Sequence, residues 1–186
     1  MTSRMHNLFG SSFCGVRIWQ HWADLALWEE FLNAHGDVQT VVELGAAHGG
    51  MTLFLEFQAQ MRGMRVYSFD LEWPVVLDAP LTAMLGMKNR FYQGDYWEDT
   101  NAVLMDLLHG ERYKPLLLLV DGGDKPREFK ALVPELAAGD YVAVHDWGRE
   151  FHAGDVKPVE GMVEQVFWEE CETPELPCLT RFWRRT

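Results

Sequence analysis

The sequence predicts an α/β fold with a mostly parallel sheet and helices on both of its faces. The segments expected to be strands are apolar along their whole length, which is typical of a sheet buried on both sides. Segments whose apolar residues recur at helical spacing alternate with these strands. The 186 residues suffice for one domain with a substantial core. We therefore expect a single domain over residues 1–186, with residues 1–20 as an N-terminal extension.

The elements follow in chain order from apolar spacing and from capping and breaking residues. Asp24 precedes an amphipathic segment that stops before Gly36, so Asp24 is expected to cap the first helix. The other expected helices are MTLFLEFQAQMRG, PLTAMLGM, WEDTNAVLMDLLHG, residues 126–138 and residues 158–170. The expected strands are residues 38–44, RVYSFDLE, RFYQGD, PLLLLVDGG, YVAVHDW and LTRFWRR. The last strand is expected to run antiparallel to the rest.

Composition and charge exclude several classes of function. A formal net charge of −12 argues against nucleic acid or an anionic membrane as partner, since a polyanion would be repelled. The three cysteines form no CxxC pair, so neither a disulfide framework nor a structural zinc site is supported. No signal peptide or membrane-spanning run is evident, and a cytoplasmic location is expected.

Polar residues at the ends of the predicted strands are the candidates for a binding site. Ligands of open parallel sheets bind at the carboxyl ends of the strands, where the strand order reverses. A single acid there can be a helix cap or a solvated loop residue, but acids recur at successive strand ends. The segments concerned are residues 43–50, 70–72, 94–95, 121–125 and 145–147.

The stretch VVELGAAHGG, residues 41–50, indicates what kind of ligand this site takes. A dinucleotide turn would read GxGxxG, but Ala46 and Ala47 follow Gly45, and the lysine of a phosphate-binding loop is also absent. The pattern is instead Glu43-x-Gly45-x-x-x-Gly49, with Asp70 ending the next strand.

This pattern resembles that of class I S-adenosylmethionine-dependent methyltransferases. The cofactor lacks a pyrophosphate, carries a cationic sulfonium and ammonium that favour acidic surroundings, and has ribose hydroxyls that Asp70 can accept from. Gly45 and Gly49 would keep side chains away from its methionine part. His48 either lines the methyl-transfer site or only fills the turn. The cofactor site implied by the resemblance is Glu43, Gly45, Ala46, His48, Gly49, Asp70, Leu71, Gly94, Asp95 and Asp121.

A narrower resemblance covers residues 14–147. The segments GVRIWQHWADLALWEEFL, VVELGAAHGGMTLFLE and RVYSFDLE are similar to the cephalosporin hydroxylase family, related to macrocin and rhamnose O-methyltransferases. In that family, acids or amides after the fourth and fifth strands hold a divalent metal, and the matching positions are Asp121, His145 and Asp146. Carboxylates suit Mg²⁺, whereas an imidazole favours ions such as Mn²⁺.

Two questions about this metal site stay open at the level of sequence. Adjacent strand residues face opposite ways, so His145 and Asp146 can share one ion only if the chain turns there. The acids can also be plain caps. The family commonly has His or Lys three residues after the metal aspartate; that position is Asp124, with Lys125 next to it. Either is a candidate general base, and His145 is a further catalytic candidate.

The sequence therefore predicts an S-adenosylmethionine-dependent O-methyltransferase that acts on a hydroxyl of a small molecule or sugar with the help of Mg²⁺ or Mn²⁺. A homo-oligomer is left open. Two alternatives remain. One is a degenerate S-adenosylmethionine-binding protein without methyl transfer activity, with a regulatory or assembly role. The other is a nucleotide-dependent oxidoreductase.

Overall fold

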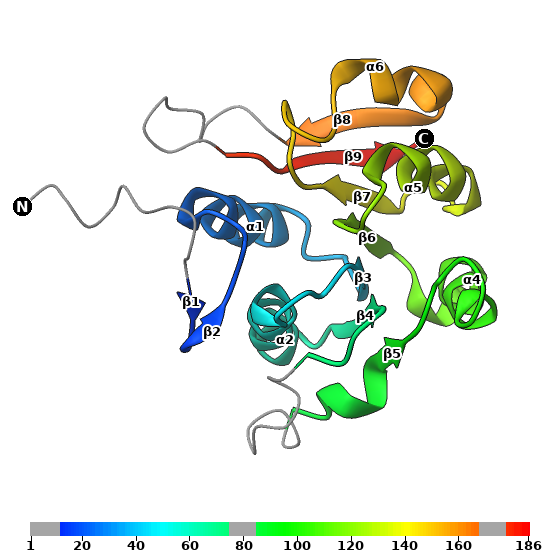
Figure 1. Cartoon of the computed structure of the whole chain (residues 1–186). Helices are drawn as coiled ribbons and strands as arrows, with labels where there is room; N and C mark the ends of the chain where they lie inside the picture. Colours follow the sequence, from blue (N-terminus) through cyan, green and yellow to red (C-terminus); the bar gives the residue numbers. More distant parts are fainter. Residues whose placement is uncertain (1–11, 75–84, 168–177) are drawn as a thin grey trace, which may run out of the picture.

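The computed structural model describes residues 12–74, 85–167 and 178–186. In these residues a seven-stranded sheet forms the middle layer, with strand order β5-β4-β3-β6-β7-β9-β8 (Figure 1). The strands are β3 (Thr40–Leu44), β4 (Arg65–Asp70), β5 (Phe91–Gln93), β6 (Leu116–Val120), β7 (Tyr141–Val144), β8 (Val163–Phe167) and β9 (Arg181–Arg185).

The first five strands of the sheet run parallel and the last two pair antiparallel. β3 lies between β4 and β6 in parallel register, and β9 pairs antiparallel with both β7 and β8. This arrangement confirms the expected fold class, including the antiparallel C-terminal strand. The chain leaves β3 in one direction to build β4 and β5, then returns to place β6 on the other side of β3. The strand order therefore reverses between β3 and β6, where a parallel sheet opens a crevice for ligands.

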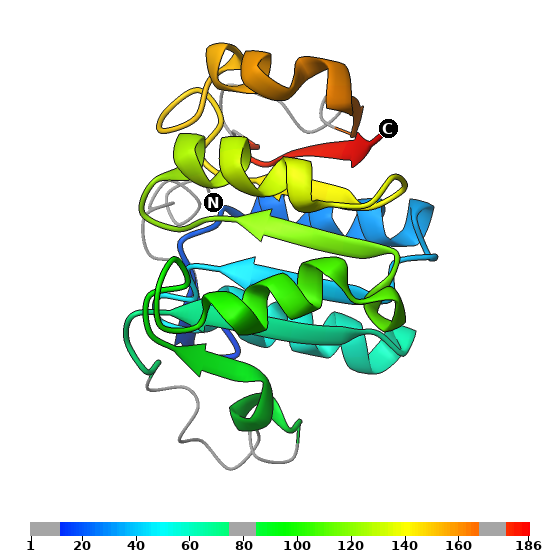
Figure 2. The ribbon, with the colours of Figure 1, turned by 90° about the vertical axis from the view of Figure 1, so that its right-hand side faces the viewer.

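Helices cover both faces of the sheet (Figures 1 and 2). Helices α1 (Trp22–Ala34) and α2 (Gly50–Arg62) pack on one face, and α4 (Asn101–His109) and α5 (Lys125–Leu132) pack on the other. Alternate residues of β6 point to the two sides: Leu117 joins the core under α1 and α2, and Leu118 joins the core under α4 and α5. The continuous apolar strands are thus explained by burial on both faces.

Short elements complete the described chain. A hairpin of β1 (Ser12–Phe13) and β2 (Val16–Arg17) precedes α1, and α6 (Ala153–Val156) follows β7. The 3₁₀ turns are η2 (Met87–Arg90), η3 (Glu111–Tyr113), η4 (Val133–Glu135) and η5 (Lys157–Met162). Most of the helix expected at residues 80–87 lies outside the described residues.

One predicted element, the length of another and one predicted cap differ from the structure. The helix expected over residues 158–170 is instead the 3₁₀ turn η5 followed by β8, because Val163 onward pairs with β9 and tertiary pairing overrides local propensity. The helix expected over residues 126–138 ends at Leu132 and tightens into η4, where Pro134 has no N–H to donate. Asp24 is not the cap of α1: the helix begins at Trp22, and Asp24 accepts from the backbone N–H of His21 at 3.1 Å.

Candidate functional site

A cavity of about 590 Å³ lies at the carboxyl ends of β3, β4, β6 and β7. Its volume is within the range of small-molecule and cofactor sites. Its walls come from residues within the segments 17–20, 45–51, 121–125 and 145–150, together with Asp70. The cavity therefore occupies the strand-reversal crevice, where the sequence predicted a binding site.

The glycine turn after β3 packs directly against the end of β6. Gly45 has a φ of +88°, in the left-handed region, and a Cβ there would overlap the backbone carbonyl oxygen of Asp121. Only glycine satisfies both demands without strain. Gly45, Ala46 and His48 line the cavity, whereas Gly49 is the N-terminal cap of α2 and does not. The turn thus forms one wall of the cavity from backbone and small side chains. The His48 ring lies against the exposed indole of Trp19, with ring centroids 6.0 Å apart.

Asp70 lines the same wall from the end of β4. One of its carboxylate oxygens accepts from the backbone N–H of Ala47 at 2.7 Å, and the other accepts from Glu72 N–H at 3.0 Å. A carboxylate oxygen can accept more than one hydrogen bond, so Asp70 fixes the turn and still has lone pairs to offer a ligand. This geometry suits the part that the sequence assigned to Asp70.

Glu43 lies beneath the turn instead of in the cavity. Its side chain is fully buried, and one oxygen accepts from the hydroxyls of Thr52 and Ser68, each at 2.6 Å. Burial raises the pKa of Glu43 to about 8, against the partly opposing effect of these two hydrogen bonds. The expectation of direct cofactor contact by Glu43 needs correction: its carboxyl joins β3, β4 and α2 underneath the turn.

Three other predicted cofactor residues also lie outside the cavity lining. Leu71 is 66% exposed, and Gly94 and Asp95 follow β5. Asp95 accepts from the backbone N–H of Trp97 at 2.8 Å, as an acid in a turn commonly does. The described structure gives these residues no contact with the cavity.

The predicted metal ligands Asp121, His145 and Asp146 come together at the opposite wall. One ligand atom from each residue lies within 4.8 Å of the others. Nδ1 of His145 is 3.3 Å from Oδ1 of Asp121 and 3.4 Å from Oδ2 of Asp146. The two neighbours can share this space because the chain turns after β7, where Asp146 has a φ of +63°. The turn therefore lets His145 and Asp146 face the same ion, which adjacent residues of a regular strand could not do.

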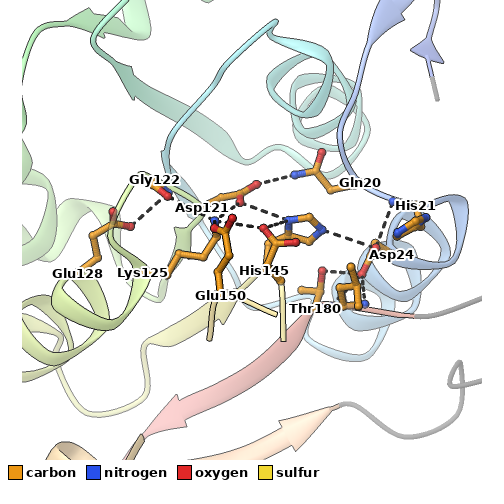
Figure 3. Close-up of polar contacts among 12 residues, drawn as sticks. Gln20, His21, Asp24, Asp121, Gly122, Lys125, Glu128, His145, Glu150 and Thr180 are labelled. Carbon is orange, nitrogen blue, oxygen red and sulfur yellow. Dashed lines mark hydrogen bonds and ion pairs between the residues drawn. The ribbon is translucent and has the colours of Figure 1, made fainter. Parts of the chain in front are cut away.

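His145 is held from behind by a buried carboxylate. Nε2 of His145 is 3.8 Å from Oδ2 of Asp24, too far for a hydrogen bond, so this contact is electrostatic (Figure 3). Asp24 itself accepts at 2.8 Å from three donors, the backbone N–H groups of Leu179 and Thr180 and the hydroxyl of Thr180. Asp24 thus ties α1 to the start of β9 and places a charge behind the histidine.

Charges around the cluster decide its protonation. Burial opposes a charge on His145, but Asp121, Asp146 and Asp24 outweigh it and raise the pKa of the imidazole well above 6.5. Burial would likewise raise the pKa of Asp146, but His145 and then Lys125 hold it below its ordinary range.

Lys125 points into the same cluster, and Asp124 does not. Nζ of Lys125 lies 3.4 Å from Oδ1 of Asp121 and 2.7 Å from Oε2 of Glu150 (Figure 3). It also lies 3.2 Å from Oδ2 of Asp146. Burial disfavours the ammonium, but these carboxylates outweigh that effect and raise the pKa of Lys125 above the ordinary 10.5. Asp124 is the N-terminal cap of α5, accepts from Arg127 N–H at 3.2 Å and does not line the cavity. Asp124 is therefore corrected as a candidate base, whereas Lys125 lines the cavity and stays a candidate.

Sequence reasoning missed three residues of the site. Nε2 of Gln20 donates to Oδ2 of Asp121 at 2.6 Å across 101 positions of sequence, so the segment treated as an extension forms a wall of the cavity. Asp24 was interpreted only as a cap, and Glu150 was not singled out. No local pattern marks these residues, because each acts through a partner far along the chain.

The donor set fits a divalent cation. Two carboxylates and one imidazole suit Mn²⁺ and similar ions, and carboxylates alone suit Mg²⁺. A ligating histidine commonly has a carboxylate near its second nitrogen, as His145 has in Asp24.

The fold is the Rossmann-like fold of class I S-adenosylmethionine-dependent methyltransferases, with the glycine turn after β3 and the acid that ends β4 in the expected places. It is similar to solved structures of CmcI. The apo form is 18% identical, with a TM-score of 0.66 over 94% of this chain and 76% of that one. CmcI with Mg and SAM is 16% identical, with a TM-score of 0.62 over 95% of this chain and 76% of that one.

A further similarity is to a mutant of MtNAS in complex with S-adenosylmethionine, at 12% identity and a TM-score of 0.55, over 88% of this chain and 62% of that one. No protein-family model matches the sequence, and no curated protein matches it. At such identities the likeness establishes a common fold. Across the described ranges, no helix is both long and apolar enough to cross a membrane.

Proposed function

We propose that this protein transfers a methyl group from S-adenosylmethionine to a hydroxyl of a small molecule or sugar, assisted by a divalent cation. The observation that carries the proposal is that one cavity joins the glycine turn and Asp70 to the cluster of Asp121, His145 and Asp146. Methyl transfer needs both a donor and a positioned acceptor oxygen, and the cavity has a wall suited to each.

The wall formed by the turn and Asp70 suits the cofactor. Asp70 is anchored by two backbone N–H groups and has lone pairs left for ribose hydroxyls. The turn itself offers no lysine to a phosphate, and Gly45 brings its backbone close to Asp121. Structures of CmcI with SAH and with Mg and SAM, which share this fold, support the assignment.

The opposite wall suits the acceptor. A bound divalent cation would lower the pKa of an acceptor hydroxyl and orient its oxygen. Asp121, His145 and Asp146 would hold that cation; Gln20 fixes Asp121 by a hydrogen bond, and Asp24 lies behind His145. The ammonium of Lys125 is buried beside the same carboxylates. These groups position charge, and a proton released by the acceptor can pass to solvent through the open side of the cavity.

Cofactor binding is tested by titration calorimetry with S-adenosylhomocysteine. Asp70→Asn is expected to weaken binding about tenfold or more, because the variant loses a charged acceptor for the ribose. Glu72→Gln is the matched control: it removes one negative charge two residues away, and Glu72 does not line the cavity. Equal affinity in the native protein and Asp70→Asn, or binding of NAD(H) in place of S-adenosylhomocysteine, would refute the assignment.

Turnover is tested by following S-adenosylhomocysteine formation from S-adenosylmethionine with a panel of catechols, phenols and glycosides, with and without Mg²⁺ or Mn²⁺. We expect cation-dependent product with at least one hydroxylated acceptor, and loss of that dependence in Asp121→Asn. Tight cofactor binding without any turnover and without cation binding would favour the degenerate cofactor-binding protein.

A further inference from the structure

Lys125 places a positive charge of the protein's own among the residues that would hold the metal. Its side chain is 5% exposed, and Nζ lies 3.4 Å from Oδ1 of Asp121 and 3.2 Å from Oδ2 of Asp146. Oδ1 of Asp121 also lies 3.3 Å from Nδ1 of His145. The ammonium and a divalent cation would thus contact the same two carboxylate oxygens.

We propose that Lys125 is an internal competitor of the divalent cation and that Glu150 is the carboxylate that receives its ammonium when the cation binds. The inference rests on the proposed function, because it concerns the same metal site. In this proposal Lys125 limits the affinity of the site for the divalent cation, because the cation binds only as the lysine withdraws from Asp121 and Asp146.

The ammonium of Lys125 and a bound divalent cation would repel each other. Two cations within a few ångströms of each other repel strongly in a partly buried site, where the effective dielectric constant is well below that of water. Nζ of Lys125 has carboxylate oxygens of Asp121, Asp146 and Glu150 within 3.4 Å, which are the surroundings that a buried ammonium requires. Asp121 and Asp146 are therefore already neutralised in part, and a divalent cation must replace an existing favourable contact.

Lys125 has an alternative partner outside the two aspartates. The shortest of its three ion pairs is to Oε2 of Glu150, at 2.7 Å, and Glu150 is not one of the three metal-ligand candidates. The side chain of Glu150 is 63% exposed, so it can move without disturbing the core. Lys125 is the first residue of α5, so its backbone is fixed while its four-carbon stem can redirect the ammonium. A short movement toward Glu150 would free both aspartates.

The experiment measures Mn²⁺ binding to the full chain by electron paramagnetic resonance of the free ion, without cofactor or acceptor. Lys125→Met is expected to bind Mn²⁺ about tenfold tighter or more than the native protein, because the competitor is gone. Glu150→Gln is expected to bind Mn²⁺ more weakly, because the lysine loses its alternative partner. Lys130→Met removes an exposed lysine of the same helix and is the matched control, with native affinity expected.

The double variant separates competition from a general change of charge. If Glu150 acts through Lys125, the effect of Glu150→Gln should largely vanish in the Lys125→Met background. An equal loss of affinity in both backgrounds would overturn the assignment of Glu150. Native or weaker Mn²⁺ binding by Lys125→Met would overturn the assignment of Lys125 while leaving the metal site of the proposed function intact.

Two further outcomes complete the test. Mn²⁺ binding by neither the native protein nor Lys125→Met would overturn both the competitor and the metal site. If Lys125→Met does not fold, as judged by thermal unfolding, Glu150→Gln alone decides, since native or tighter Mn²⁺ binding by that variant contradicts the proposal.

Discussion

The buried carboxyl of Glu43 should make the stability of the protein fall with rising pH. Burial raises its pKa to about 8 from the ordinary 4.5; Ser68 and Thr52 oppose this in part, and the charges of Asp121 and Asp70 add to it. Between these two pH values the unfolded chain has lost the proton that the folded protein keeps. The folded state binds more protons, so the free energy of unfolding declines as pH rises.

The size of the decline follows from the two pKa values. Each pH unit between 4.5 and about 8 removes at most about 1.4 kcal/mol, so the full effect reaches about 5 kcal/mol above pH 8. Glu43→Gln keeps a neutral side chain of similar shape and can still accept from both hydroxyls. It removes this one contribution, so the difference in stability between variant and native protein should grow by several kcal/mol from pH 5 to pH 9.

Urea unfolding followed by far-ultraviolet circular dichroism, at intervals from pH 5 to pH 9, measures this difference. Glu30→Gln is the control, because Glu30 is exposed on α1 and its variant should follow the native pH dependence. Parallel stability curves for Glu43→Gln and the native protein would show that Glu43 is ionised at neutral pH in the fold and that the reasoning is wrong.

Two further substitutions test the packing of the site by urea unfolding at pH 7. Gly45→Ala should lower the free energy of unfolding by about 2 kcal/mol or more, because a Cβ would overlap the backbone of Asp121 at a position with positive φ. Gly63→Ala is the control: Gly63 has a φ of +72° but open space around it, so the loss should be only about 1 kcal/mol. Equal losses in the two variants would contradict the overlap at Gly45. Asp24→Asn should lower the free energy of unfolding by about 2–4 kcal/mol, because three donors from the chain before β9 share one buried carboxylate oxygen of Asp24. A loss below about 0.5 kcal/mol would show that Asp24 does not hold this part of the chain in place.

Most of the fold was readable from the sequence because the strands are buried on both faces. The five consecutive apolar residues of β6 and the Val-rich β3 are typical of strands buried on both faces. The failures occurred where local pattern and tertiary pairing disagree. The segment that begins at Val163 has no strong strand pattern of its own and becomes a strand because Arg181–Arg185 lies beside it.

The candidate site, like the fold, could be predicted from the sequence only in part. Asp70, Asp121 and His145 could be predicted because strand ends converge at one edge of a parallel sheet. Glu43 was expected to contact the cofactor, but its side chain is buried beneath the turn and does not line the cavity. The order of residues in a motif does not give the direction of a side chain. Gln20 had no signal at all, because its contact with Asp121 spans 101 positions.

That long contact has a consequence for any molecule that binds in the cavity. A molecule large enough to span the cavity would contact residues 17–20 and 145–150 at once and would join segments that are distant along the chain. It would act as a reversible cross-link of the native state, raising the free energy of unfolding in proportion to the logarithm of its concentration above the dissociation constant. Resistance to heat and to proteases therefore reports occupancy directly, and it can be used to search for the acceptor before any turnover has been seen.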